Sequence, residues 1–189
     1  MKPIITKEKK EKTERIKQVI IGVALIIIMF FSIAAYSFQK EDRGSNTKVE
    51  YNGFEFVKQN DLWILNTNGI NLAFKYNPNE IEEIGGSLNL LDSYSNQPLY
   101  ISSENIETIQ EIYQNMNLFV LRIREACLDE KECKDNLPVK TCEDNFIIIK
   151  KAELSKIYQQ DNCVFIEGKK EDLIKLSDEF MFKILGIRA

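Results

Sequence analysis

Four cysteines are the side chains in this sequence whose type and spacing most directly suggest chemistry. They lie in the last third of the chain, at Cys127, Cys133, Cys142 and Cys163. An even number of cysteines outside the cytoplasm predicts two disulfides, although sequence alone leaves all three pairings open. We prefer Cys127 with Cys133 across the end of a helix. We then pair Cys142 with Cys163, because each stands at the start of a β-branched strand.

Other roles for the four cysteines are disfavoured by their spacing. The pattern C-x5-C-x8-C-x20-C lacks the paired C-x2-C knuckles of a zinc ribbon, and the chain contains no histidine to complete a mixed zinc site. A thioredoxin-like redox role needs two close thiols, usually C-x-x-C, and that spacing is also missing. We therefore expect structural disulfides, with no metal, no cofactor and no redox catalysis.

The absence of histidine also narrows the possible enzymes. It removes the commonest general base near neutral pH and the usual Ser-His-acid and Cys-His relays. A hydrolase could still work with two carboxyl groups that face each other across a cleft, one of them with a raised pKa. The acids available for such a pair are Glu80, Glu82, Glu83, Glu143 and Asp144.

A charged loop at residues 128–136, bracketed by cysteines, offers a possible calcium site. Its acidic residues are Asp129, Glu130, Glu132 and Asp135. The alternating ligand order and the glycine of an EF-hand loop are missing, so we expect a solvated acidic loop.

Residues 19–38 (VIIGVALIIIMFFSIAAYSF) form a run without a charged side chain. At 1.5 Å per residue, a helix of this length covers roughly 30 Å, the thickness of the hydrocarbon core of a bilayer. We expect a single-pass transmembrane helix here, with the lipid bilayer as its partner.

The charges on either side of this run predict its orientation. Residues 1–18 carry seven Lys and Arg side chains, against four within twenty residues on the far side of the run (Lys40, Arg43, Lys48 and Lys58). With its three acids the tail has a net charge of +4, and the remaining chain, with 18 basic and 26 acidic side chains, has a net charge of −8. Because basic tails stay in the cytoplasm, we expect a cytoplasmic tail at residues 1–18, a linker at 39–47 and an extracytoplasmic domain at 48–189. An acidic body also argues against nucleic acid as a partner.

A cleaved signal peptide is an alternative reading of the same run. Small residues at Ser32 and Ala34, or at Ala35 and Ser37, follow an apolar core and resemble a cleavage site. The long tail of mixed charge and the full membrane width favour an uncleaved signal-anchor. An inverted protein with a cytoplasmic body is the third possibility.

The first part of the body has the pattern of an antiparallel meander of about four strands. Runs of alternating apolar residues between positions 49 and 76 are separated by Asn52-Gly53 and Asn68-Gly69. Asn-Gly tolerates the positive φ that two-residue hairpin turns require. We expect Trp63 and the phenylalanines of these strands in the core, and not in an aromatic platform for a sugar or peptide.

The rest of the body alternates between strands and helices. Apolar residues at helical spacing predict a helix that begins after a cap at Ser102 or Ser103 and runs to about Cys127. A second helix starts near residue 171 and ends near Gly186. The remaining predicted elements are a short helical turn at 79–84, strands at 99–101, 137–141 and 146–149, and a hairpin at 156–160 and 163–167. The predicted fold class is α+β, with a β-meander and a mixed sheet covered by two helices.

Three segments of the body carry a resemblance to a known group of proteins. The phrases YNGFEF (51–56), NCVFIEG (162–168) and LIKLSDEFMFKILGI (173–187) resemble small, single-pass, extracytoplasmic proteins encoded by archaea, which have no assigned activity. The resemblance implies a surface-facing anchored domain with paired cysteines. It carries over no functional residue.

These observations favour a non-enzymatic binding or assembly module. Its partner would be an envelope protein, a surface layer or a second copy of the chain. The histidine-free hydrolase with paired carboxylates is the alternative function. A third possibility is that the basic tail itself contacts cytoplasmic partners or anionic head groups.

Overall fold

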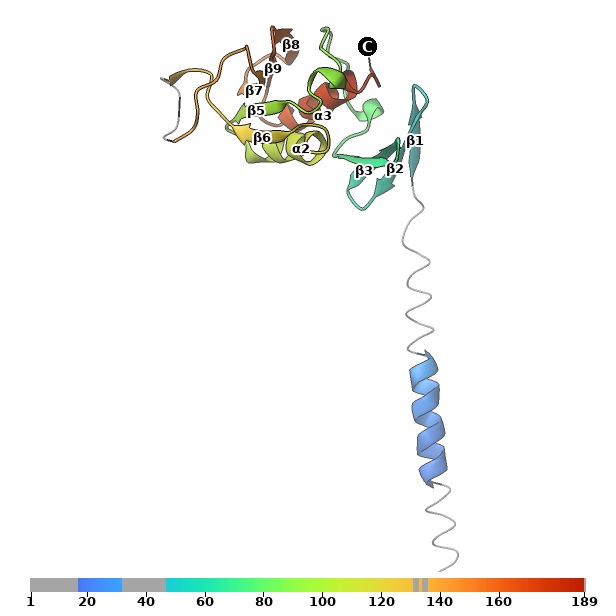
Figure 1. Ribbon diagram of the computed structural model, residues 1–189. Helices are drawn as coiled ribbons and strands as arrows, with labels where there is room; N and C mark the ends of the chain where they lie inside the picture. The colour runs from blue at the N-terminus through green and yellow to red at the C-terminus, as the bar shows by residue number, and fades with distance from the viewer. Residues whose placement is uncertain (1–16, 32–46, 131–132, 134–135, 189) are drawn as a thin grey trace, which may run out of the picture. The chain divides into compact units, whose positions relative to one another are not determined.

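The computed structural model describes residues 17–31, 47–130, 133 and 136–188. The chain divides into two units, Met1–Ser45 and Asn46–Ala189, which we treat separately. Figure 1 shows the elements of both units.

The first unit contains a helix over residues 17–31. Its large apolar side chains are mostly exposed, up to 73% for Phe31. Among the described residues, no helix is both long enough and apolar enough to cross a membrane. The second part of the predicted span, residues 32–38, lies outside the described residues.

The second unit begins with the predicted meander, an antiparallel sheet in the order β1-β2-β3-β4. The strands are β1 (Lys48–Tyr51), β2 (Phe54–Gln59), β3 (Leu62–Thr67) and β4 (Ile70–Phe74). Both Asn-Gly turns are confirmed, because Asn52 and Asn68 have φ of 48° and 51°, and the glycines that follow them also have positive φ. The core positions predicted for Trp63, Phe56 and Phe74 are confirmed, since all three are buried, whereas Phe54 is half-buried and packs against the same core.

A second, five-stranded sheet has the order β6-β5-β7-β9-β8. Its strands are β5 (Pro98–Ser103), β6 (Arg122–Glu125), β7 (Asn145–Lys151), β8 (Lys156–Gln160) and β9 (Cys163–Gly168). All neighbours pair in parallel except β8, which forms the predicted antiparallel hairpin with β9. The central strand β7 is buried on both faces over residues 146–149, as its unbroken apolar run predicts.

The helix α2 (Ile106–Met116) follows β5 and differs from its prediction at both ends. Its cap is Asn105, whose side chain accepts a hydrogen bond from the Glu107 N–H, and not Ser102 or Ser103. Its end falls well before Cys127, because the following residues turn back and form β6 at the edge of the sheet beside β5. The apolar spacing continued past Met116, but strand pairing with β5 determined the backbone there.

Two shorter predictions were only partly right. Residues 137–141 contain no strand, and Val139 forms an isolated bridge with Cys127. The helical turn expected at 79–84 is a 3-10 helix at Pro78–Glu80 capped by Asn77, and a second one lies at Leu91–Ser93.

The helix α3 (Leu173–Ile184) matches its prediction and ends at Gly186, which has a φ of 69°. The Gly186 N–H donates to the Lys183 carbonyl and the Ile187 N–H to the Phe182 carbonyl, which is a Schellman motif. Together α2 and α3 cover one face of the five-stranded sheet, and the buried face of the meander packs into the same core (Figure 1). The domain is therefore α+β.

A smaller core lies on the other face of the five-stranded sheet. Tyr100, Phe146, Ile148 and Cys163 from the strands pack there against Ala126 and partly buried residues of the cysteine-containing segment. That segment, between β6 and β7, takes the place of a third covering helix.

Candidate functional site

The cysteines form two disulfides, Cys127–Cys133 and Cys142–Cys163, which is the pairing we preferred from the sequence. The Cα atoms are 5.3 Å and 4.9 Å apart, which suits a disulfide. They close loops in the segment that covers the second face of the sheet. Among the described residues there is no free thiol, so these cysteines have a structural role.

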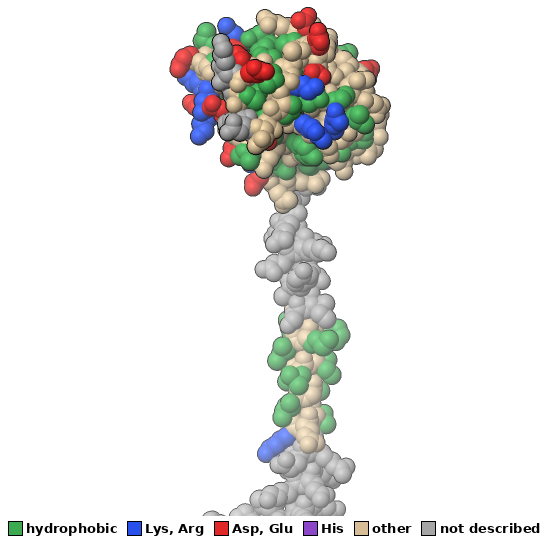
Figure 2. Space-filling view, turned by 60° about the vertical axis from the view of Figure 1, so that its left-hand side comes forward, with side chains coloured by type: hydrophobic (Ala, Val, Ile, Leu, Met, Phe, Trp, Pro, Cys, Tyr) green, Lys and Arg blue, Asp and Glu red, His purple; other side chains and the backbone are tan. Residues whose placement is uncertain are grey.

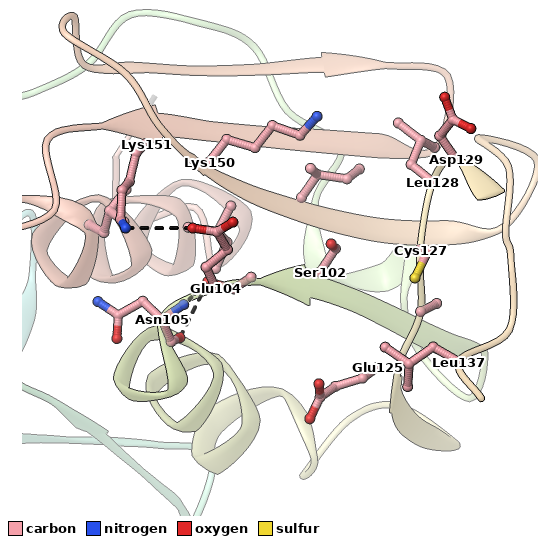
Figure 3. A pocket seen from close by; sticks show the side chains of 15 residues that line it. Ser102, Glu104, Asn105, Glu125, Cys127, Leu128, Asp129, Leu137, Lys150 and Lys151 are labelled. Atoms are coloured by element: carbon pink, nitrogen blue, oxygen red, sulfur yellow. Dashed lines mark hydrogen bonds and ion pairs between the residues drawn. The ribbon is translucent and has the colours of Figure 1, made fainter. Parts of the chain in front are cut away.

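A crevice of about 480 Å³ lies where β5 and β7 end, between the sheet and the cysteine-containing segment (Figure 3). After β5 the chain passes through α2 to β6, and after β7 it passes through β8 to β9 on the opposite side. Where the connections of two neighbouring parallel strands run to opposite sides of the sheet, a crevice forms at the carboxyl ends of those strands. Ligands usually bind at this position in such sheets. The volume lies within the range of about 300 to 1,000 Å³ that is typical of ligand pockets.

Charged groups of both signs line this crevice. Lys150 and Lys151 stand at the end of β7, and Glu104 follows β5. The acids Glu125, at the end of β6, and Asp129, beyond the first cysteine, also line it. The Lys151 Nζ is 3.5 Å from the Glu104 Oε2, and Figure 3 shows this ion pair at the rim. The site can therefore present donors and acceptors to a polar molecule.

The polar groups at the start of α2 are occupied by one another. Ser103 Oγ accepts a hydrogen bond from the Asn105 N–H at 3.0 Å and lies 2.9 Å from the Thr108 hydroxyl. Asn105 Oδ1 accepts from the Glu107 N–H at 3.0 Å. The helix start thus shapes the crevice wall, while its capping groups are used within the helix.

Ser102 and Lys150 are the residues closest to a catalytic arrangement. Ser102 pairs in register with Ile148, so Lys150, two residues further along β7, belongs to the same face of the sheet. A serine and a lysine in contact form a histidine-free catalytic pair in some hydrolases. Figure 3, however, marks no hydrogen bond between the exposed Lys150 side chain and Ser102. The pair therefore lacks the contact through which an amine activates a hydroxyl.

The structure does not bring the acids of the hydrolase hypothesis together in one cleft. Glu80 belongs to the 3-10 helix after the meander, where its carboxylate accepts from the Asn77 N–H at 2.9 Å. Asp144 forms an ion pair with Lys140 at 3.3 Å. Glu143 lines a separate pocket near Cys142, and neither Glu82 nor Glu83 lines that pocket or the crevice.

The acidic loop proposed as a calcium site is only partly described. Asp129 lines the crevice and Glu130 follows it, whereas Glu132 and Asp135 lie outside the described residues. Within the described part of the chain, no three His, Cys, Asp or Glu residues form a group that could hold a metal ion.

Tyr100 lies next to this region, under the cysteine-containing segment. The Lys140 Nζ is 4.3 Å from the centre of its ring, and Lys140 and then Arg122 lower the pKa of its phenol. In turn the phenol is the main group that raises the pKa of Lys140. Because Tyr100 is buried among core residues, we assign this group a structural role that holds Lys140 over the sheet.

No protein-family model, no curated protein and no solved structure matches this chain. The resemblance to archaeal single-pass proteins stays a prediction from three sequence segments.

Sequence reasoning did not find the crevice. The available signal was polar residues directly after two buried strands, at 102–105 and 150–151. It could not be used, because the segment after the first strand was expected to begin a longer helix and the parallel pairing of the strands was not predicted.

Proposed function

We propose that this protein is a membrane-anchored, extracytoplasmic binding module without enzymatic activity, and that it holds a component of the cell envelope at the crevice beside β5 and β7. The crevice is the observation that carries the proposal. It offers a ligand-sized space at the carboxyl ends of parallel strands, lined by both acidic and basic side chains.

The surface of the body supports a polar, near-neutral ligand. Figure 2 shows acidic and basic side chains intermixed on the face that is turned forward. No single sign dominates this face, in contrast to the basic surfaces that bind nucleic acid. We therefore expect recognition by hydrogen bonds and local ion pairs. An envelope protein, a surface-layer component or a second copy of this chain could supply the matching groups.

Two features support the extracytoplasmic location that we propose. Disulfides persist in oxidising compartments, and both cysteine pairs are joined. Residues 17–31 form a helix with outward-facing apolar side chains, as a lipid-contacting segment requires. We propose that residues 19–38 span the membrane, that residues 1–18 are cytoplasmic, and that residues 48–189 form the external domain.

A photo-crosslinking experiment in native membranes tests the binding proposal. A photoreactive amino acid replaces Ser102 in the crevice of the full-length chain, and in a control chain it replaces the exposed Glu50 of β1. We expect a discrete adduct from position 102 that is absent from position 50. Identical adducts from both positions, or none from either, would contradict a specific site in the crevice.

A mass measurement tests the location independently. Protein from native membranes is alkylated at its thiols with and without prior reduction, and its intact mass is determined. We expect a full-length mass with four alkylated cysteines only after reduction. Four alkylated cysteines without reduction would place the body in a reducing compartment. A shorter mass that begins after residue 34 or 37 would favour the cleaved signal peptide.

A further inference from the structure

Two carboxyl groups meet in the interior of the body, between α2 and α3. Asp178 of α3 is 0% exposed and Glu111 of α2 is 8% exposed. The two helices pack against each other, and each carboxyl acts on the pKa of the other, so the two groups are near neighbours. The Asp178 Oδ2 accepts a hydrogen bond from the Tyr76 N–H at 2.9 Å, and the Glu111 Oε1 accepts one from the Gln114 side chain at 3.0 Å.

The second oxygen of Asp178 is the feature that needs an explanation. Oδ1 is buried, and no donor among the described residues reaches it. A proton held between Asp178 and Glu111 would supply the missing hydrogen bond, whereas two ionised carboxylates would repel each other in a medium of low dielectric.

The charged groups around the pair do not compensate two negative charges. The Lys75 backbone N–H lies near both carboxyls and lowers their pKa but forms no hydrogen bond with Asp178 Oδ1, and the exposed Lys75 side chain only attracts Glu111 from a distance. Lys175 of α3 is directed to the Tyr76 ring, with its Nζ 5.4 Å from the ring centre. Neither carboxyl forms an ion pair with another residue in the described part of the chain. Burial therefore raises the pKa of both carboxyls, and the proximity of Glu111 raises that of Asp178 further.

We propose that Glu111 and Asp178 share one proton and act as a proton-dependent latch, which fastens the chain after β4 to the two helices and opens when the shared proton is lost to solvent. In the closed state the pair carries one negative charge, and Asp178 holds the Tyr76 N–H. In the open state two carboxylates face water, and α2, α3 and the end of the meander separate locally. The device lies apart from the crevice and does not depend on what the crevice binds.

The direction of the pH effect follows from linkage. In an opened or unfolded chain, carboxyls of this kind titrate near 4, below their values in the closed state. The stability that the latch contributes is therefore complete below that range and is lost as pH rises through the raised values. Between the pKa values of the open state and the raised value of the closed state, opening releases one proton and becomes about tenfold more favourable for each pH unit.

The test measures amide hydrogen exchange in the full-length chain in detergent micelles between pH 5 and 9, corrected for intrinsic exchange. The reporter is the Tyr76 amide. Two variants remove the titration and keep the shape: Asp178→Asn, whose amide can donate to Glu111, and Glu111→Gln, which can donate to Asp178. Glu107→Gln is the matched control, because Glu107 is an exposed acid on the same helix.

In the wild type and in Glu107→Gln, we expect the protection of the Tyr76 amide to fall with rising pH, up to the tenfold per unit that one released proton gives. In Asp178→Asn and Glu111→Gln it should stay constant. Should one variant fail to fold, the other still decides. A wild-type protection that is independent of pH, or the same pH dependence in both variants, would overturn the latch.

Discussion

A buried ion pair between Arg188 and Glu179 gives the sharpest prediction about stability. Glu179 of α3 is 0% exposed, and Arg188, just beyond the helix, is 7% exposed. The Arg188 Nη1 donates to the Glu179 carboxylate, and its Nη2 donates to the Pro78 and Ile81 carbonyls. Replacement of Arg188 by Met keeps an unbranched side chain that fills the inner part of the same space, and it removes the charge and the donors.

The magnitude follows from what is left behind. Arg188→Met leaves Glu179 buried without its cation, and it leaves two carbonyls without their donor. Breaking a buried ion pair on one side costs roughly 3 to 5 kcal/mol. A domain of this size has a total stability of roughly 5 to 15 kcal/mol, so the loss is a large share of the whole. Because both groups are buried, solvent screening does not reduce this value.

The pH dependence separates the charge from the packing. Burial already raises the pKa of Glu179, and Arg188 is the main group that opposes this rise. Without Arg188 the pKa rises further, so in the variant the carboxyl is protonated and neutral over a wider acidic range. The part of the free energy of unfolding that depends on a protonated Glu179 is present at low pH, and it is lost as the pH rises through the pKa of Glu179 in the folded variant. The destabilisation should therefore be smaller at pH 5 than at pH 8.

Denaturant unfolding of the full-length chain in micelles, followed by the fluorescence of Trp63, provides the assay. This is the only tryptophan in the sequence, and it is buried in the meander. Glu179→Gln combined with Arg188→Met serves as the control, because it removes the stranded charge and should recover part of the loss. The reasoning would be refuted by a loss below about 1 kcal/mol, the value of an exposed pair, or by a loss that is the same at both pH values.

Three further predictions use the same unfolding assay at pH 7. Asn115→Ala removes a side chain that pairs with both backbone groups of Ala73 in β4, and the half-buried N–H left behind should cost roughly 1 to 3 kcal/mol. No change would mean that water replaces the side chain. Gly86→Ala places a methyl group 2.5 Å from the Ile157 carbonyl oxygen, at a φ of 134°. The variant should lose roughly 1 to 3 kcal/mol of its free energy of unfolding. An unchanged unfolding midpoint would show that this strand edge can move. Joint replacement of Cys142 and Cys163 by Ala opens a loop with a sequence separation of 21. The free energy of unfolding should fall by about 3 kcal/mol. Wild-type stability in this variant would show that the loop is ordered without the bond.

Local signals in the sequence predicted the elements whose structure depends on neighbouring residues. The turns at Asn52-Gly53 and Asn68-Gly69 required positive φ, and the alternating residues beside them could bury only one face. The start of a β-branched strand at Cys163 also supported the pairing with Cys142.

Features set by distant residues were not predictable in this way. The helix α2 stops at Met116 although its apolar spacing continues, because β5 offers a strand edge to residues 122–125. Asp178 and Glu179 look like the solvent-facing side of an amphipathic helix, yet both are buried. Segments from elsewhere in the chain cover that side, and one sequence gives no sign of them.

The contact between Tyr51 and Arg188 has a consequence for how the protein is made. The Arg188 Nε donates to the Tyr51 hydroxyl at 3.2 Å, and the two residues are 137 positions apart. The meander is synthesised first, but the contact between Tyr51 and Arg188, and the packing of the meander against α3, cannot form until the chain has been made as far as Arg188. Until then its apolar face stays uncovered, and the long separation of the partners slows their pairing. If the body is exported, it would cross the membrane before this contact closes, and chaperones that bind apolar strands would be needed mainly during that interval.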